Sequence, residues 1–302
     1  MKALFTLEYI LQQLLNGLIL GCMYALLALG MTVVYGILRL INFAHGILIT
    51  LGAFFCYICL VMLDIPFAAT IILLMAFGAL IGLVLDTVAY RGLRGGPEVA
   101  LLITSLGFYI LLENLIKMIA SPQPYAFRPP PFLDQLHHIW KLTFRTVDVF
   151  IIAFSFTLML VFALFVEKTK LGVAMRATAE SVETARLVGI NVDRVIAVAF
   201  ILGSAIAAAT GFMWGAKYGQ ISYDMGFIAG IKAFVAVVIG GVGSIPGAMI
   251  GGLLLGIIEI LSIALLPPGF AAYRDGIVFV ILILVLLIRP SGIMGKKEEV
   301  RA

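Results

Sequence analysis

The chain has 302 residues, of which 63% are hydrophobic and 12% are charged, with a formal net charge of +4. A soluble domain carries about 45–50% apolar and about 25% charged residues, so this composition excludes a soluble globular protein and indicates an integral membrane protein. The small positive charge reflects basic residues placed between apolar stretches, and it does not indicate a nucleic-acid partner.

Nine apolar stretches are candidates for membrane-spanning helices, because about 20 apolar residues cross the hydrocarbon layer as a helix. The first is long enough for a span plus a half-helix and is expected to be broken, while the seventh and ninth are short. In chain order they are Leu7–Leu38, Ile41–Leu63, Phe67–Tyr90, Val99–Ile119, Val147–Val166, Val195–Ala216, Gly226–Ile239, Gly247–Leu266 and Gly276–Ile288. We predict an all-α polytopic membrane protein, a single domain over residues 1–302 with about eight or nine membrane helices and with broken helices among them.

Lysine and arginine are distributed unevenly between the two sides of this bundle. Twelve of the twenty lie on one side, six on the other and two within spans. The richer side carries Arg39, the loop with Arg91 and Arg94, the interval 168–194 and the C-terminal tail. Because cytoplasmic loops are enriched in these residues, the richer side is predicted to be cytoplasmic, with the C-terminus inside and the N-terminus outside.

A break in helical structure is expected at Tyr35–Gly46, where Asn42 and His45 interrupt an apolar stretch, and another at Gly240–Gly247. Non-helical backbone at membrane depth persists only where protein or a water-filled cavity satisfies its polar groups, and such breaks often border transport paths. Asn42 and His45 are therefore candidate pathway residues. An ordinary cytoplasmic turn is the alternative for the first break.

The largest external segment is residues 121–146, which contains five of the eleven prolines. Proline removes backbone donors and stiffens the chain, so we expect an ordered or semi-rigid loop here rather than a span.

The interval from Lys168 to Arg194 is the longest charged stretch between two apolar spans. Ser181 is a suitable N-cap for a short helix whose apolar positions are Val182, Ala185 and Val188. Gly189 follows where a helix end favours a left-handed residue. The pattern predicts a surface helix of about two turns, roughly 12 Å long. It is either a docking helix for a cytoplasmic partner or an amphipathic loop lying on lipid headgroups.

Two ionisable residues lie within the predicted seventh and eighth spans. Lys232 and Glu259 are at similar depths if the two helices are antiparallel neighbours, and they are then expected to pair. The pair is interpreted either as a structural lock or as a gate on the pathway.

Glycines recur at four-residue spacing near the eighth span. In lipid, helices associate through close contact of small residues, so these glycines are predicted to pack helices together. They are Gly243, Gly247, Gly251, Gly252 and Gly256.

No serine–histidine–acid set, metal-ligand cluster or pair of carboxylates outside the spans occurs in the sequence, so an enzyme is not supported. The chain instead resembles the LivH-type permease subunits of bacterial branched-chain amino-acid ABC importers. The resemblance covers nearly the whole length and is strongest over residues 16–46, 175–197 and 226–259. The middle segment is similar to the EAA loop of ABC importers, with Glu183, Thr184, Ala185 and Gly189 at the motif positions. Thr184 replaces the second alanine of the motif.

The resemblance implies an ATPase-coupling loop within residues 168–194. Its residues would be Arg176, Ala177, Glu180, Ser181, Val182, Glu183, Ala185, Gly189 and Asn191. It also implies a multi-pass protein of the bacterial inner membrane, in contact with lipid, that forms the path for leucine, isoleucine, valine or related amino acids.

The expected partners are a second, LivM-like permease subunit, two ATP-binding subunits (LivG-like and LivF-like) and an external amino-acid-binding protein. ATP and magnesium would belong to the ATP-binding subunits, and this chain would carry no cofactor. The alternative is an ion-coupled secondary carrier of small apolar solutes, which needs a relay of acidic or histidine residues at mid-membrane. Glu259 and His45 are the candidates for such a relay, and they do not form a chain in the sequence.

Overall fold

The computed structural model describes residues 6–266, 273–289 and 291–295. Within these ranges, seven helical segments are long and apolar enough to cross a membrane, and α9 is a shorter apolar helix. The long helices are α1 (Leu7–Leu38), α3 (Phe67–Val84), α4 (Glu98–Ile119), α5 (Thr146–Lys168), α8 (Val192–Tyr218) and α10 (Ile245–Leu265). The shorter ones are η2 (Phe43–His45), α2 (Ile47–Tyr57), η3 (Ile58–Met62), η4 (Leu85–Tyr90), η5 (Arg91–Leu93), α6 (Lys170–Glu180), α7 (Val182–Leu187), α9 (Met225–Gly240) and α11 (Arg274–Ile288). One more span, the second in chain order, combines η2, α2 and η3 over Phe43–Met62. The protein is thus an all-α polytopic membrane protein, as predicted.

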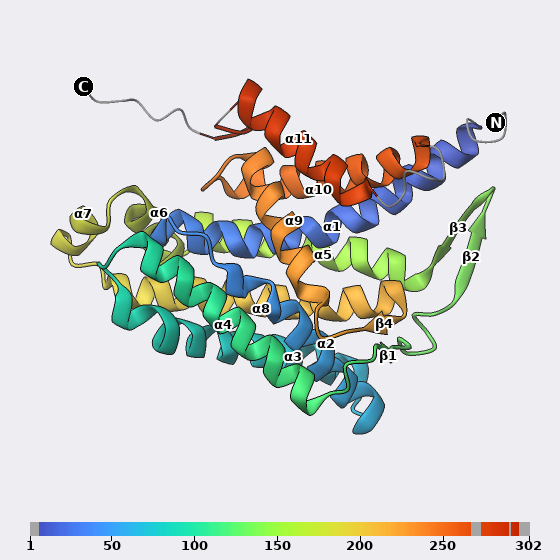
Figure 1. The fold of residues 1–302 in the computed structure, drawn as a ribbon, viewed down its shortest axis with the longest axis horizontal. Helices are drawn as coiled ribbons and strands as arrows, with labels where there is room; N and C mark the ends of the chain where they lie inside the picture. Colours follow the sequence, from blue (N-terminus) through green and yellow to red (C-terminus); the bar gives the residue numbers. More distant parts are fainter. Residues whose placement is uncertain (1–5, 267–272, 290, 296–302) are drawn as a thin grey trace.

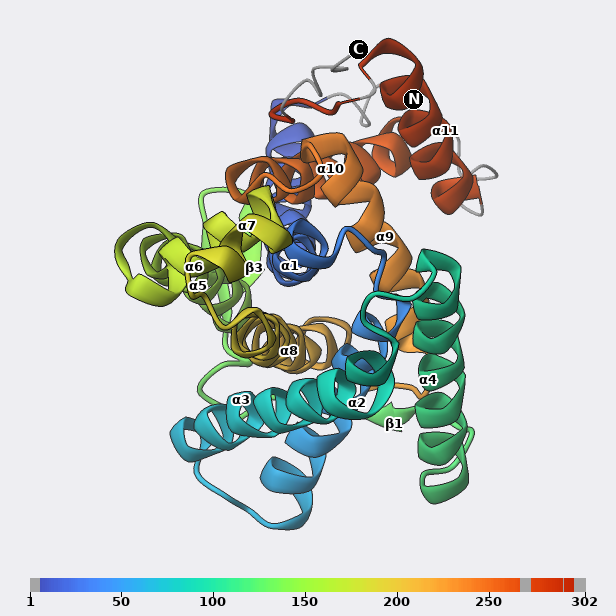
Figure 2. The ribbon, with the colours of Figure 1, turned by 90° about the vertical axis from the view of Figure 1, so that its left-hand side faces the viewer.

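The long helices α1, α5 and α8 run along the length of the molecule (Figure 1). Helices α6 and α7 project at one end, here named the α7 end, and a β-hairpin projects at the other, here named the hairpin end. Viewed from the α7 end, α1 is surrounded by α5, α8, α9 and α10, with α3 on the far side of α8 (Figure 2). The first helix in the chain is therefore the central one.

Helix α1 is continuous over Leu7–Leu38, so the predicted break within that stretch is wrong. Its 32 residues make a rod about 48 Å long, and every residue from Ile19 to Val34 is buried. The residues beyond the length of one span continue the same helix, which contains no proline. The helix ends at Arg39, whose φ of 53° is left-handed.

Glycines in α10 allow two neighbouring helices to approach its backbone, as predicted. A Cβ at Gly252 or Gly256 would overlap the backbone of α1, at Ala25 and Gly21 respectively. On the other face, a Cβ at Gly247 or Gly251 would overlap the backbone of α9. Helix α10 is therefore held between α1 and α9 by contacts that tolerate no side chain.

Gly243 does not pack helices, contrary to the prediction. Its φ is +79° and a Cβ there would meet no atom within 4 Å. It lies in the turn Gly241–Ser244 between α9 and α10, and Ser244 caps α10 by accepting a hydrogen bond from the Gly247 N–H (3.2 Å). The predicted break at Gly240–Gly247 is thus a tight connection between α9 and α10 rather than an interruption of one helix.

The segment between α4 and α5 contains short strands, β1 (Tyr125–Ala126), β2 (Leu136–Ile139) and β3 (Leu142–Arg145), and β4 (Gln220–Ile221) follows α8. Strands β2 and β3 form the antiparallel hairpin, in which Leu136 is opposite Arg145, and β1 pairs with β4. The proline-rich loop is therefore ordered by backbone pairing as well as by its prolines.

Candidate functional site

The chain re-enters the bundle between α1 and α2 in a non-helical conformation. From Arg39 to Asn42 the backbone is non-helical, with a bend at Leu40 and an extended conformation at Asn42, and then η2 leads into α2. Asn42 and His45 are each only 1% exposed. The His45 ring lies against Gly30, which is eight residues before the end of α1 and thus about 12 Å inside it. This placement favours a break inside the bundle over an ordinary turn at its surface.

Three buried polar atoms near this break have no hydrogen-bond partner among the described residues: Thr32 Oγ1, Asn42 Nδ2 and His45 Nε2. The other polar atom of the Asn42 amide, Oδ1, accepts a hydrogen bond from the Tyr90 hydroxyl at 2.8 Å. An unsatisfied buried polar atom costs about 1–3 kcal/mol, and buried polar atoms are usually paired, so three of them near one break are an unusual feature.

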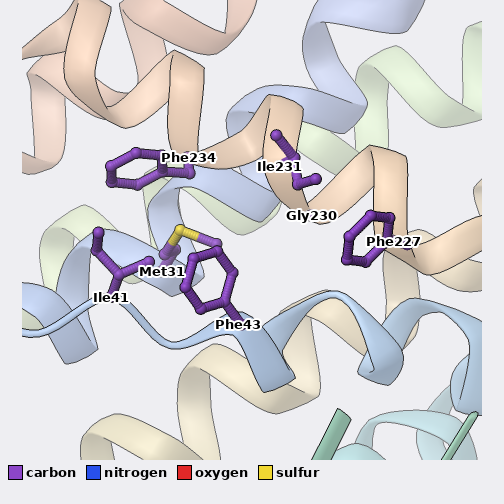
Figure 3. A pocket seen from close by; sticks show the side chains of 7 residues that line it. All are labelled: Met31, Ile41, Phe43, Phe227, Gly230, Ile231 and Phe234. Carbon is purple, nitrogen blue, oxygen red and sulfur yellow. The ribbon is translucent and has the colours of Figure 1, made fainter. Parts of the chain in front are cut away.

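An apolar pocket lies where this segment faces α9 (Figure 3). It is small, with a volume of about 10 Å³, which is room for about one water molecule. It is lined by Met31 of α1, Ile41 and Phe43 of the break, and Phe227, Gly230, Ile231 and Phe234 of α9. Close approach of Gly46 to Gly226 and Gly230 holds the two walls together. The break is therefore directly beside an apolar opening.

The predicted ion pair between Lys232 and Glu259 is present. Lys232 Nζ lies 2.8 Å from Glu259 Oε1, and both side chains are buried. Two residues that the sequence analysis missed complete the cluster: Asp275 lies 2.7 Å from Lys232, and Arg274 also pairs with Glu259. The sequence predicts one ion pair, and the structure contains a network of four charged residues.

This network borders a second pocket, which has a volume of about 330 Å³ and is open to the surface. It is lined by Tyr24, Trp214, Met225, Ile228, Ala229, Lys232, Arg274 and Asp275. The lining residues of α8 and α11 lie near the ends of those helices that point towards the hairpin (Figure 1). The buried Tyr24 hydroxyl lies beside the carboxylate of Glu259 here.

The coupling segment predicted from sequence forms two helices at the α7 end. The sequence analysis missed α6, which precedes the predicted helix, while α7 begins after Ser181 as expected. Ser181 Oγ accepts a hydrogen bond from the Thr184 N–H at 3.2 Å. Gly189 has a φ of +83°, the left-handed conformation predicted for it. Asn191 then caps α8 by accepting from the Arg194 N–H (3.0 Å).

The exposed face of α7 differs from the predicted one. Ala185 is buried and Val182 half-buried, as expected, but Val188 is 70% exposed because it follows the last residue of the helix. Leu187 is 83% exposed beside it. The short helix therefore presents an apolar pair outward instead of burying it.

The other predicted coupling residues lie on α6 and α7. Arg176 donates to the Glu167 carbonyl (3.2 Å), and Ala177 accepts from the Ser181 N–H (3.2 Å). Glu180 and Glu183 are exposed. The structure thus brings the residues predicted to act in coupling together at the α7 end, whereas Lys232 and Glu259 belong to a separate cluster near the hairpin ends of α8 and α11.

Residues 13–286 match the protein family described as branched-chain amino acid transport system, permease component. The chain is 40% identical to the high-affinity branched-chain amino acid transport system permease protein BraD of Pseudomonas aeruginosa, over 95% of this chain and 96% of the relative. It is 41% identical to the permease protein LivH of Escherichia coli K12, over 96% and 97%. It is 29% identical to a probable LivH of Methanocaldococcus jannaschii, over 93% and 91%. No solved structure matches the chain. The chain belongs to the family of permease components of branched-chain amino acid transport systems.

Proposed function

We propose that this chain is a membrane subunit of an ATP-driven importer and forms part of the path for leucine, isoleucine, valine or related amino acids. One observation carries the proposal: Leu187 and Val188 are exposed on a short, capped helix at one end of a membrane bundle. An exposed apolar pair beside polar residues is typical of a docking surface. Energy would enter through that surface from an ATP-binding partner, because a partner that binds two states differently shifts their populations.

The predicted pathway residues support the same proposal. Asn42 and His45 place unpaired polar atoms at a break beside an apolar pocket, and such breaks occur where backbone lines a cavity. The walls formed by Met31, Ile41 and Ile231 match a branched side chain in polarity.

The assembly would contain a second, LivM-like permease subunit, LivG-like and LivF-like ATP-binding subunits that carry ATP and magnesium, and an external amino-acid-binding protein. The protein would lie in a bacterial inner membrane with its α7 end and C-terminus in the cytoplasm and its N-terminus outside. Of the basic residues that support this orientation, Lys2, Lys296, Lys297 and Arg301 lie outside the described residues.

Uptake of labelled leucine into proteoliposomes tests the proposal. The assembled transporter with its binding protein should import leucine only with ATP, and Leu187→Ser/Val188→Ser should abolish import without lowering the melting temperature of the chain. Leu136→Ser, at an exposed position of the hairpin, is the matched control and should retain import. Leucine uptake by the chain alone on an ion gradient would support the ion-coupled carrier instead.

A further inference from the structure

The charged pocket near the hairpin ends of α8 and α11 combines two cations and two anions with an apolar wall. Lys232 and Arg274 supply the positive charges, and Glu259 and Asp275 supply the negative ones. Met225 and Ile228 of α9 and Trp214 of α8 add apolar surface in the same pocket. A ligand of this pocket would therefore carry a negative group, a positive group and an apolar part.

A free amino acid with an aliphatic side chain does match them. Its carboxylate needs a cation, its ammonium needs an anion, and its side chain needs apolar contact. We propose that this pocket binds the zwitterionic head of such an amino acid, with Arg274 and Lys232 holding the carboxylate and Asp275 holding the ammonium. This inference rests on the proposed function, since it names a site for the same transported solute.

The exposure of the four charges indicates which of them are free to exchange partners. The side chains of Glu259 and Lys232 are 0% and 4% exposed, whereas those of Arg274 and Asp275 are 33% and 50% exposed. The buried pair fixes the base of the pocket. The outer two are close enough to water to release a partner and accept the head of a ligand.

The base of the pocket is polar. Tyr24 lines the pocket and is fully buried, and its hydroxyl lies beside the carboxylate of Glu259. A hydroxyl donor and a carboxylate acceptor at this depth satisfy each other and give the head of a ligand a polar floor.

The pocket and the apolar opening at the α1–α2 break lie on two faces of one helix. Residues 225, 228, 229 and 232 of α9 line the charged pocket, and residues 227, 230, 231 and 234 line the apolar one. Each set follows helical spacing. An amino acid held by its head in the first pocket is therefore separated from the second by the thickness of α9.

Protection of an introduced cysteine tests the site in the full-length chain in lipid nanodiscs. Ile228 lines the pocket and is 45% exposed, and the native Cys22, Cys56 and Cys59 are buried. In Ile228→Cys, L-leucine should slow alkylation by a charged thiol reagent about tenfold at about ten times its dissociation constant. The leucine analogues 4-methylpentanoate, which lacks the ammonium, and 3-methylbutylamine, which lacks the carboxylate, should protect much less. Leu136→Cys on the hairpin is the matched control and should not be protected.

Asp275→Asn in the Ile228→Cys chain should weaken the affinity for leucine measured by protection about tenfold, and Asp275→Glu should restore it. The inference is overturned if leucine gives no protection in a chain with a normal melting transition, or if 4-methylpentanoate protects as well as leucine. It is also overturned if Asp275→Asn leaves leucine protection unchanged. Leucine uptake by the assembled transporter is measured separately, so uptake without protection refutes this site alone, and protection without uptake refutes the proposed function.

Discussion

Lys232 is held from two sides, since its ammonium lies 2.8 Å from Glu259 and 2.7 Å from Asp275. Glu259 is likewise shared between Lys232 and Arg274. Lys232 and Glu259 each have two partners, so each keeps one ion pair when one of its partners is removed. A simple exchange of the two charges does not preserve the network, because Lys232→Glu would face Asp275 and Glu259→Lys would face Arg274.

A double-mutant cycle measures the pair without creating like-charge contacts. We expect Lys232→Met and Glu259→Gln each to lower the free energy of unfolding, with a coupling energy of about 0.5–3 kcal/mol, because neighbouring charges in one network are not additive. Denaturant unfolding of the purified chain measures it.

Lys117 supplies the control for this cycle. Its ammonium, on α4, lies over the ring of Tyr223 in the turn before α9, 5.1 Å from the ring centroid. Lys117→Met and Glu259→Gln should be additive within about 0.5 kcal/mol. Additivity of the Lys232 and Glu259 variants would contradict the network.

At Gly189, the effect of a substitution depends on the backbone conformation and not on side-chain contacts. Its φ is +83° and an added Cβ would contact nothing within 4 Å. Gly189→Val should introduce about 1–2 kcal/mol of strain and lower the number of leucine molecules imported per ATP hydrolysed. Gly189→Asn should keep this ratio near normal, because asparagine tolerates the left-handed region. An unchanged ratio in Gly189→Val would show that the turn has no part in coupling.

The sequence reveals some of these residues and hides others for physical reasons. Lys232 and Glu259 are visible because a charge in an apolar span is conspicuous. Asp275 and Arg274 lie at a helix end, where charges are ordinary, and Tyr24 is one aromatic in an apolar run. Their shared pocket exists only through tertiary packing.

At the scale of elements, α10 depends on small residues where it crosses α1. Gly252→Ala should lower the melting temperature of the chain, because its Cβ would overlap the backbone of Ala25 rather than a movable side chain.

Gly107→Ala in α4 is the matched control, since a Cβ there meets no atom within 4 Å. It should leave the melting temperature unchanged or raise it, because alanine favours helix over glycine by about 1 kcal/mol. Equal losses of stability in the two variants would refute the close packing of α1 and α10.

Long apolar elements were predictable, whereas short or mixed ones were not. Hydrophobic length identifies spans such as Glu98–Ile119 and Thr146–Lys168 to within a residue or two. Helix α6 has only 11 residues, and its sequence KLGVAMRATAE mixes polar and small side chains. The β2–β3 hairpin turns at Trp140 and Lys141, without the Asn-Gly or Asp-Gly signal that marks a two-residue turn.

At the scale of the molecule, the two ends are proposed to face opposite compartments. A cysteine at Ile139 in the hairpin should react with an impermeant thiol reagent added to intact cells, because that residue is 63% exposed. A cysteine at Leu187 on α7 should react only after the membrane is permeabilised. The reverse pattern would invert the proposed orientation.

Helix α1 leaves the ribosome before any of the helices that surround it. Its neighbours α8, α9 and α10 are synthesised about 150 to 250 residues later. Until α10 is made, Gly17 and Gly21 lack the helix against which they pack in the folded protein. Assembly of the core must therefore wait for the second half of the chain, and a polypeptide truncated before α10 would insert its first helix without ever completing the packing around it.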